Sequence, residues 1–387
     1  MSLKDQDSQM AFKNGGQNAI IIGAGLAGLI CGILLNRRDI GVTIIEKKKF
    51  PFHRVCGEYI SNEVLPFLNT LGLNIENLEP SHIDQLTISS ARGMVLESPL
   101  QQGGFGISRY VFDHHLYQLA NREGVEFIFS KANEIIYTDE GFQVQLANNQ
   151  TLYSPLVIGA YGKRSNLDQK LKRSFFYRRS PYLGVKYHLH TDLPTNQIRL
   201  DSFSGGYSGI CSIESGKYNL CYLSEVSNLK KYGNLAEMEE QILFKNPHIR
   251  HLFKNSEFLF NKPIVINEIS FDQKSLIENH VLFCGDAAGM ISPLCGNGMA
   301  MAIHSGKILA ESILQCYIPN SSFNRSLLEK IYQQRWKKTF AARLQTGRFM
   351  QKLLVNKHLS HWAISALKKT PSITQFLVKN THGKAFM

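Results

Sequence analysis

The stretch NAIIIGAGLAGLICGILLNRRDIGVTIIE, residues 18–46, decides the fold. It opens with a β-branched run that ends in glycines, continues with helical apolar spacing, and closes with the strand-like GVTIIE. The expected order is therefore strand, turn, helix, strand. A membrane-spanning segment is disfavoured, because glycines occupy the middle of the uncharged run and a second strand completes the unit.

Three glycines in this stretch, Gly23, Gly25 and Gly28, have the G-x-G-x-x-G spacing, and Glu46 ends the second expected strand. Gly23 allows a tight turn, Gly25 has no Cβ to block a diphosphate, and Gly28 lets the helix approach the strand closely. Free N–H groups and the helix dipole attract phosphate there, while a carboxylate at Glu46 can accept hydrogen bonds from ribose hydroxyls. The stretch therefore predicts a dinucleotide-binding site.

Length and composition indicate an ordinary globular protein. The 387 residues suffice for about two or three packed units, and 43% hydrophobic with 19% charged residues is typical of globular chains. The seven cysteines are scattered without a C-x-x-C pair or a His–Cys cluster, so no metal site and no disulfide framework is predicted. We expect reduced thiols and a cytoplasmic location. Association with a membrane surface is compatible with that location.

The net charge of +12 is concentrated at one end of the chain. From residue 330 onward there are twelve Lys or Arg and no Asp or Glu, which leaves 31 basic against 31 acidic residues before it. Tyr332, Trp336 and Phe340 recur at helical spacing in this region, which indicates a basic amphipathic helix. Such a helix either lies on an anionic membrane surface or packs on the protein body with its charges solvated. No nucleic-acid recognition motif accompanies the charge, so no nucleic-acid partner is expected.

Other segments continue the α/β pattern. The segment 108–124 is an expected helix followed by the strand-like VEFIF, and PLVIG at 155–159 is another buried strand. In residues 181–225, segments with strand-like alternation of side chains are separated by glycine-rich turns, which predicts an antiparallel sheet. A last buried strand ends at Gly285, and a helix with several small residues begins near Asn297.

Five features together resemble the signature segments of FAD-dependent oxidoreductases in the superfamily of geranylgeranyl reductases and aromatic-ring hydroxylases, the flavoprotein monooxygenases. They are GAGLAG at 23–28, Glu46, RVCGEYIS at 54–61, GAYGKRS at 159–165 and GDAAGMISPLCGNGM at 285–299. The resemblance implies an α/β fold: a Rossmann-like FAD-binding domain with a parallel sheet, an antiparallel β-sheet substrate domain and C-terminal helices.

The resemblance also implies non-covalent FAD with its adenosine end at the glycine turn. Asp286 would bind the ribitol or pyrophosphate region, and the loop 293–299 would surround the isoalloxazine. Arg54 and Arg109 lie in matched segments and suit a diphosphate, because guanidinium groups bind such anions bidentately. The expected cofactor-binding residues are Gly23, Ala24, Gly25, Ala27, Gly28, Glu46, Lys47, Arg54, Arg109, Gly285, Asp286, Pro293, Gly296, Asn297, Gly298 and Met299.

Cys56 is the candidate catalytic residue. Its C–G segment is similar to that of geranylgeranyl reductases, and Gly289 in GDAAG, where ring hydroxylases usually carry His, also favours the reductase branch. The alternative is a buried and inert thiol, since free cysteine is among the most buried residue types.

Tyr59, Tyr207 and Gly209 are the candidate substrate-binding residues. Two positions depart from the family pattern: Gly209 stands where the reductases often carry Trp, and Tyr161 replaces the Asp of a G-A-D-G segment. The first departure leaves the substrate's identity open. The second removes a carboxylate from the flavin-facing turn.

The resemblance implies an enzyme that acts on a hydrophobic small molecule. The leading hypothesis is reduction of a carbon–carbon double bond by flavin hydride. The alternatives are an NAD(P)H- and oxygen-dependent monooxygenase that hydroxylates a phenolic or polyketide ring, and a carrier of FAD or lipid without turnover. Only one dinucleotide fingerprint is present, so NAD(P)H or another reductant is expected either to bind transiently near the flavin or to come from a partner protein.

The expected domain organisation is discontinuous. The FAD-binding domain would comprise 15–80, 108–175 and 266–318, the substrate domain 81–107 and 176–265, and the basic helical region 319–387.

Overall fold

The opening stretch forms the unit that its pattern predicts. The computed structural model describes residues 18–317, 324–355 and 357–387. In it β1 (Asn18–Ile22) leads through the glycine turn into α1 (Leu26–Asn36), and β2 (Gly41–Glu46) pairs with β1 in parallel. The isoleucines of β1 are buried, as the β-branched run requires. The predicted strand, turn, helix and second strand are confirmed.

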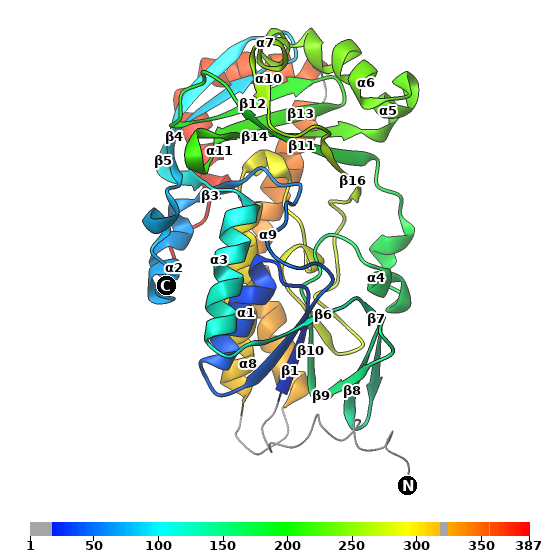
Figure 1. Ribbon diagram of the computed structural model, residues 1–387. Helices are drawn as coiled ribbons and strands as arrows, with labels where there is room; N and C mark the ends of the chain where they lie inside the picture. Colours follow the sequence, from blue (N-terminus) through cyan, green and yellow to red (C-terminus); the bar gives the residue numbers. More distant parts are fainter. Residues whose placement is uncertain (1–17, 318–323, 356) are drawn as a thin grey trace.

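A six-stranded sheet continues from this unit and forms the lower layer of the molecule (Figure 1). In spatial order its strands are β17 (Ile277–Glu278), β18 (Val281–Phe283), β10 (Leu156–Gly159), β1, β2 and β6 (Glu126–Phe129). All neighbours are parallel except β17, which pairs antiparallel with β18. The predicted α/β class with a parallel sheet is therefore confirmed.

Both faces of this sheet are covered. Figure 1 shows α1, α3 (Arg109–Arg122) and α8 (Gly298–Cys316) side by side on one face, and a three-stranded sheet of β7 (Ala132–Thr138), β8 (Gly141–Leu146) and β9 (Thr151–Ser154) on the other. Small residues bring α1 and α8 together: a Cβ at Gly306 would lie 2.4 Å from the Ala27 carbonyl oxygen. A Cβ at Gly285, φ +61°, would lie 2.9 Å from Ala27 Cβ, so the turn after β18 also contacts α1.

A nine-stranded sheet forms the upper layer, and it confirms the predicted antiparallel β-sheet; its role as a substrate domain stays a proposal. Its order is β15 (Glu257–Phe258), β11 (Tyr182–His190), β14 (Tyr218–Glu225), β13 (Gly206–Ser212), β12 (Gln197–Phe203), β4 (Ser81–Ser89), β5 (Val95–Gly106) and β3 (Tyr59–Ser61), with β16 (Ile264–Ile269) also pairing with β11. The β12–β4 pair is parallel, and the other pairs are antiparallel.

Shorter helices connect these strands. They are α2 (Leu65–Thr70), α4 (Asn166–Lys170), α5 (Val226–Tyr232), α6 (Leu235–Gln241) and α7 (Pro247–Asn255). The helix α6 ends at Gln241, and a separate helix begins at Pro247, because proline fits the first turn of a helix.

The basic C-terminal region forms α9 (Arg325–Val355), α10 (Lys357–Lys368) and α11 (Pro371–Thr381). The apolar stripe of α9 packs on the protein: Tyr332 and Phe340 are fully buried, and the Trp336 ring lies 3.1 Å from where a Cβ at Gly289 would be. Of the two alternatives for this stripe, packing on the body is therefore the one observed.

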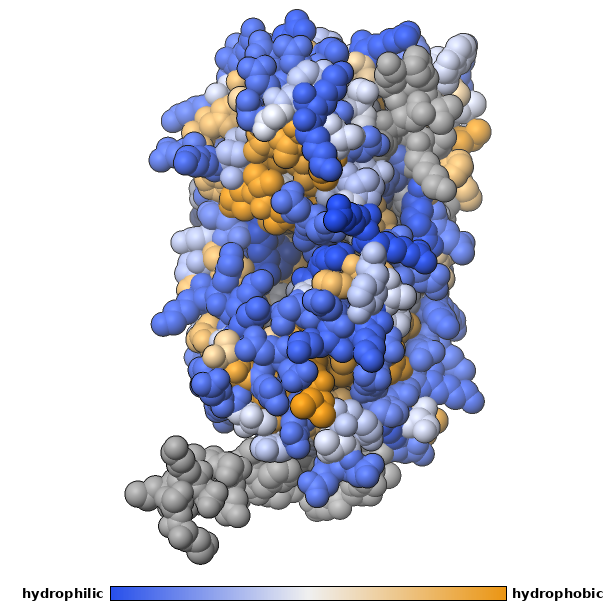
Figure 2. Space-filling model, turned by 90° about the vertical axis from the view of Figure 1, so that its right-hand side faces the viewer, coloured by the Kyte–Doolittle hydropathy of each residue, from blue (hydrophilic) through white to orange (hydrophobic). Residues whose placement is uncertain are grey.

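None of the described helices combines the length and apolarity needed to cross a bilayer. Figure 2 shows one face of the molecule, which is largely hydrophilic, with a hollow at mid-height and hydrophobic side chains gathered above it. The six-segment domain division stays a proposal.

Candidate functional site

In the glycine turn, backbone atoms crowd Gly23 and Gly28, whereas the space beside Gly25 is open. Gly23 has φ +107°, and a Cβ there would lie 2.5 Å from the Ala160 carbonyl oxygen. A Cβ at Gly28 would lie 2.1 Å from the Gly23 carbonyl oxygen. At Gly25, by contrast, the nearest atom to such a Cβ is Arg109 Nη2 at 3.9 Å. The open side is where a diphosphate would approach.

The N-terminus of α1 presents backbone donors to that open side. Its first intrahelical bond runs from the Leu29 N–H to the Gly25 carbonyl at 2.9 Å, so the N–H groups of Leu26, Ala27 and Gly28 precede the helical ladder. Within the described chain no side chain caps this end. Uncapped donors at the positive end of a helix dipole fit a bound phosphate.

Glu46 ends β2, and its carboxylate faces the glycine turn. Its Oε2 accepts a hydrogen bond from the Ala24 N–H at 3.1 Å and lies 3.3 Å from Arg54 Nη2. Its Oε1 accepts a hydrogen bond from the Lys48 N–H at 3.2 Å. The neighbouring Lys47 is exposed. The structure thus brings the predicted acid to the turn.

Arg54 and Arg109 lie together because both bind the buried carboxylate of Asp113 on α3. Arg54 Nε donates at 3.1 Å, and Arg109 donates through Nε at 2.5 Å and Nη2 at 2.7 Å. Arg109 also lies nearest to the open side of Gly25. Two guanidinium groups held beside an uncapped helix N-terminus suit a diphosphate.

Asp286 lies in the turn after β18 among cationic side chains. Burial raises the pKa of this carboxyl, and the charges of Lys274, Arg109 and Lys163 oppose that rise. Burial also lowers the pKa of Lys274 and of Lys163, each to about 8. The Lys274 ammonium donates to the backbone carbonyls of Asp286 at 2.7 Å and Lys163 at 2.6 Å. The Asp286 carboxyl therefore lies in the electrostatic field of several cationic side chains.

The loop 293–299 begins with a 3-10 turn at Pro293–Cys295 and runs into α8, whose first residues are Gly298 and the buried Met299. Gly296 has φ +63°, and a Cβ there would lie 3.0 Å from Tyr59 Cδ1. The loop therefore contacts the RVCGEYIS segment, and two of the matched segments meet in space.

Tyr161, which replaces the family's Asp, is part of a buried network. Its hydroxyl donates to Asp168 Oδ1 at 2.7 Å, and the same oxygen accepts from Arg173 Nη1 at 2.8 Å. Arg173 Nη2 in turn donates to the carbonyls of Ser275 at 2.7 Å and Ala287 at 2.8 Å. A carboxylate is still present in this region, seven residues later than in the family pattern.

A second buried charge cluster was not predicted. Glu58, at φ +56°, receives the Lys186 ammonium and the Arg109 N–H on Oε1, the latter at 2.7 Å, and lies 2.8 Å from His188 Nε2 on Oε2. Glu58 and Lys186 have no exposed side-chain surface. The available signal was the placement of Lys186 and His188 two residues apart on a strand that is otherwise apolar, which puts them on one face.

Cys56 is half-buried beside this cluster. Burial raises the pKa of its thiol, partly offset by the charge of Arg109, so the thiol is protonated at neutral pH. Its carbonyl accepts a hydrogen bond from Asn219 Nδ2 at 3.0 Å. A protonated thiol is a poor nucleophile, and a catalytic role for Cys56 stays a proposal.

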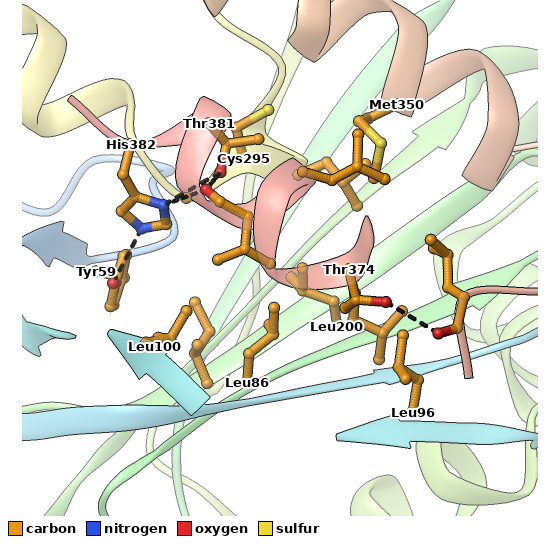
Figure 3. A pocket seen from close by; sticks show the side chains of 17 residues that line it. Tyr59, Leu86, Leu96, Leu100, Leu200, Cys295, Met350, Thr374, Thr381 and His382 are labelled. Carbon is orange, nitrogen blue, oxygen red and sulfur yellow. Dashed lines mark hydrogen bonds between the residues drawn. The ribbon is translucent and has the colours of Figure 1, made fainter. Parts of the chain in front are cut away.

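An apolar cavity separates the upper sheet from the C-terminal helices (Figure 3). Leucine and isoleucine side chains of β4, β5 and β12 form its floor, and α9, α10 and α11 form its roof. The lining residues are Tyr59, Leu86, Ile88, Leu96, Leu100, Ile198, Leu200, Leu294, Cys295, Gly296, Met350, Leu367, Thr374, Leu377, Val378, Thr381 and His382. Leu294, Cys295 and Gly296 belong to the predicted isoalloxazine loop, so the cavity borders that loop.

Polar groups gather at the loop end of this cavity. Figure 3 shows Tyr59, Thr381, His382 and Cys295 together there, while Leu96 and Thr374 lie at the opposite end. The Tyr59 hydroxyl lies 3.3 Å from His382 Nε2, and burial raises the pKa of this phenol. A mostly apolar cavity with a few polar groups at one end suits a hydrophobic ligand.

The other two candidate substrate residues do not line the cavity. Tyr207 is buried in β13, and Gly209 pairs with Leu200 of β12, where a Cβ would lie 3.3 Å from Leu200 Cδ2. Gly209 therefore acts indirectly, because its missing side chain leaves room for Leu200, which does line the cavity.

A buried glutamate ties the C-terminal segment to the loop 293–299, and this was also not predicted. Glu63 accepts hydrogen bonds from Asn297 Nδ2 at 3.3 Å, from Arg343 Nη1 at 3.0 Å and from the Gly383 N–H. Asn297 Nδ2 also donates to the Thr381 carbonyl at 3.0 Å. The C-terminal segment thus closes the loop end of the cavity.

The fold and these sites define a flavin-dependent oxidoreductase. A family model described as FAD binding domain matches residues 17–335, so the chain belongs to that family.

Individual relatives differ in activity. The chain is 23% identical to Digeranylgeranylglycerophospholipid reductase of Methanosarcina acetivorans, over 88% of this chain and 85% of that protein, and 23% identical to Conditioned medium factor receptor 1 of Dictyostelium discoideum, over 82% and 67%. Among solved structures, the flavin-dependent brominase Bmp2 superposes with a TM-score of 0.78 at 18% identity, covering 96% of this chain and 94% of that chain. The likeness to Bmp2 supports the fold alone.

Proposed function

We propose that the protein is an FAD-dependent reductase that adds two hydrogens across a carbon–carbon double bond of a hydrophobic substrate. The observation that carries this proposal is the apolar cavity bordered by Leu294, Cys295 and Gly296 of the isoalloxazine loop. The similarity to a digeranylgeranylglycerophospholipid reductase over most of both chains supports the same reaction class.

The residues present fit FAD. The open side of Gly25, the uncapped α1 N-terminus and the arginine pair would hold the diphosphate, and Glu46 would bind the adenosine ribose. Bound FAD, once reduced by NAD(P)H or another donor of two electrons, would supply hydride to one carbon of the double bond.

The chain supplies the remaining requirements of the reaction. The leucine-lined cavity excludes water and orients the substrate along its length. The second carbon needs a proton, and Tyr59 carries one at the loop end of the cavity. Because burial raises the pKa of Tyr59, its hydroxyl is protonated at neutral pH, and its contact with His382 Nε2 provides a route for replacing the proton.

The test is an anaerobic assay. Purified protein reduced with dithionite is mixed with a detergent-dispersed geranylgeranyl lipid, and the product is analysed by mass spectrometry. The expected result is reoxidation of the flavin and a gain of two hydrogens per reduced bond, with Tyr59→Phe slowed at least about tenfold at unchanged FAD content.

Two other results would contradict the proposal. Turnover of a phenolic substrate with consumption of one O2 molecule per product would indicate a monooxygenase. A bound flavin that neither dithionite nor NAD(P)H reduces would indicate a carrier. Comparing NADH, NADPH and dithionite in the same assay identifies the reductant.

A further inference from the structure

The apolar cavity has a mouth at the end opposite the isoalloxazine loop. A surface groove there is lined by Val95–Pro99 of β5, by Leu367 and Lys368 of α10, and by Thr374 and Gln375 of α11. Leu96, Leu367 and Thr374 line both the groove and the cavity. Figure 3 places Leu96 and Thr374 at the end away from Tyr59 and His382. A long ligand can therefore reach the loop through this groove.

The two helices beside the groove carry apolar side chains toward the sheet and also on their exposed surface. Ile364 of α10 and Thr374 and Val378 of α11 face the sheet or the cavity. The opposite side of α11 exposes Ile373 (50%) and Phe376 (65%), three residues apart.

The outer side of α10 has the same character. It exposes Trp362 (75%), and Ala366 and Lys369 follow at helical spacing, both exposed. Lys368 and Lys379 are exposed as well, so the exposed apolar side chains have lysines as neighbours along both helices. Glu97, at the β5 edge of the groove, is the one acidic residue among those lining it. Apolar aromatic side chains framed by lysines match the boundary of an anionic bilayer.

We propose that the corner formed by α10 and α11 docks on an anionic lipid membrane and that the substrate passes from the bilayer through the groove into the cavity. Trp362, Ile373 and Phe376 would insert among the acyl chains, and Lys368, Lys369 and Lys379 would bind lipid phosphates. The substrate part of this inference rests on the proposed function, whereas the docking part does not.

This surface differs from the apolar stripe of α9. Tyr332 and Phe340 of that stripe are buried against the protein, so they are closed to lipid. The docking side chains come instead from the helices that roof the cavity, and membrane contact would place the groove at the lipid surface.

Trp362 provides a direct test, because the chain has two tryptophans and the other, Trp336, is 7% exposed. The full-length FAD-loaded protein is mixed with phosphatidylcholine vesicles with or without 30% phosphatidylglycerol, a fraction of roughly physiological anionic charge. We expect a blue shift of tryptophan emission and quenching by brominated acyl chains with the anionic vesicles only, and neither signal in Trp362→Phe. Equal binding to neutral and anionic vesicles, or an unshifted Trp362, overturns the docking surface.

A matched pair of variants locates the contact. Ile373→Asp/Phe376→Asp is expected to weaken vesicle binding at least about tenfold, while Tyr177→Asp, which changes a side chain of similar exposure (64%) far along the chain, leaves it unchanged. Equal loss in both variants, or in neither, contradicts the proposal.

Activity separates docking from the proposed function. The double variant is expected to reduce detergent-dispersed substrate at the wild-type rate and vesicle-embedded substrate at least about tenfold more slowly. If wild-type protein reduces neither substrate while Trp362 still inserts, the proposed function fails and the docking surface stands. If it reduces both but the variants bind vesicles equally, the docking surface fails and the function stands.

Discussion

Gly25 and Gly28 lie three residues apart, yet a methyl group at each has a different consequence. A Cβ at Gly25 has no neighbour closer than 3.9 Å, whereas a Cβ at Gly28 would lie 2.1 Å from the Gly23 carbonyl oxygen. Gly25 therefore leaves open the side on which we propose that the cofactor binds, and Gly28 keeps the turn closed.

This contrast predicts separate losses in two variants. Gly25→Ala is expected to unfold at the wild-type temperature without cofactor but to bind FAD at least about tenfold more weakly, a loss of ~1.4 kcal/mol. Gly28→Ala is expected to lower the free energy of unfolding by about 1–3 kcal/mol or more, because the turn must shift. Isothermal titration with FAD and thermal melting followed by circular dichroism measure the two effects. A Gly25→Ala protein that binds FAD normally would show that the diphosphate lies elsewhere.

Glu58 gives a pH-dependent prediction. Burial alone would raise the pKa of its carboxyl, but Lys186 and His188 outweigh burial, so the pKa is lowered from its ordinary value of 4.5. A lowered folded-state pKa means that the stabilisation is complete above pH 4.5 and is lost as the pH falls through the folded-state pKa. Removing the charge also leaves Lys186 buried without its counter-ion.

Glu58→Gln is therefore expected to lose about 3–5 kcal/mol of unfolding free energy at pH 7 and to show a flatter acid dependence below pH 4.5 than the wild type. Urea denaturation at a series of pH values measures both. The exposed Glu240→Gln serves as the control and should follow the wild-type curve. A Glu58→Gln protein with the full acid dependence would assign that dependence to other carboxylates.

Residues within a local motif were the ones that the sequence could predict. Gly23, Glu46 and their partners follow from spacing, because a turn between strand and helix has few alternatives. Glu58 and Glu63 could not be predicted in this way, since their partners Lys186 and Arg343 lie far away in the chain. A buried carboxylate is recognisable only once the fold supplies its counter-charge.

At the scale of elements, α9 packs aromatic side chains against the segment that follows β18, and its Met350 lines the cavity roof. Trp336 packs against Gly289, which belongs to the same segment as Asp286, and against Phe340 at a centroid distance of 5.4 Å. The helix therefore supports the segment that follows β18 as well as the cavity roof.

The two tryptophans allow a matched test of this support. Trp336→Ala is expected to cost about 3–5 kcal/mol of unfolding free energy, because a large buried ring is lost. Trp362→Ala should stay within about 0.5 kcal/mol, because its ring is mostly exposed. Chemical denaturation followed by circular dichroism distinguishes them. A loss in Trp336→Ala as small as that expected for Trp362→Ala would mean that this contact of α9 contributes little to the fold.

Helices and strands with strong periodicity matched their predictions, whereas the surfaces against which they pack depended on the tertiary structure. The helix over 108–124 appears as α3, with Ser108 Oγ accepting from the Val111 N–H at 3.2 Å as its N-cap. The amphipathic stripe of α9 was visible in the sequence, but its covering surface was not. Lipid and protein present the same apolar environment to such a stripe, so periodicity alone left both alternatives open.

At the scale of the whole molecule, the cavity between the upper sheet and the C-terminal helices should limit substrate size. Leu200→Trp would fill part of it from β12. We expect kcat/KM for a long-chain substrate to fall about 100-fold, equivalent to ~2.7 kcal/mol, with FAD content unchanged. Val265→Trp, which enlarges a partly exposed side chain of β16, is the control. Steady-state kinetics with normal turnover in Leu200→Trp would place the substrate outside this cavity.

The discontinuous lower sheet also has a consequence for biosynthesis. Strand β10 lies between β1 and β18: Gly159 pairs with Ile22 on one side and with Phe283 on the other. Strand β1 is synthesised before β10, but the β18 side of β10 stays unpaired until residues 281–283 have left the ribosome. Long-range pairings of this kind slow the completion of a fold and leave strand edges unprotected meanwhile. Nascent chains halted between residues 160 and 280 should accordingly depend on chaperones, and they should become protease-resistant only once β18 has emerged.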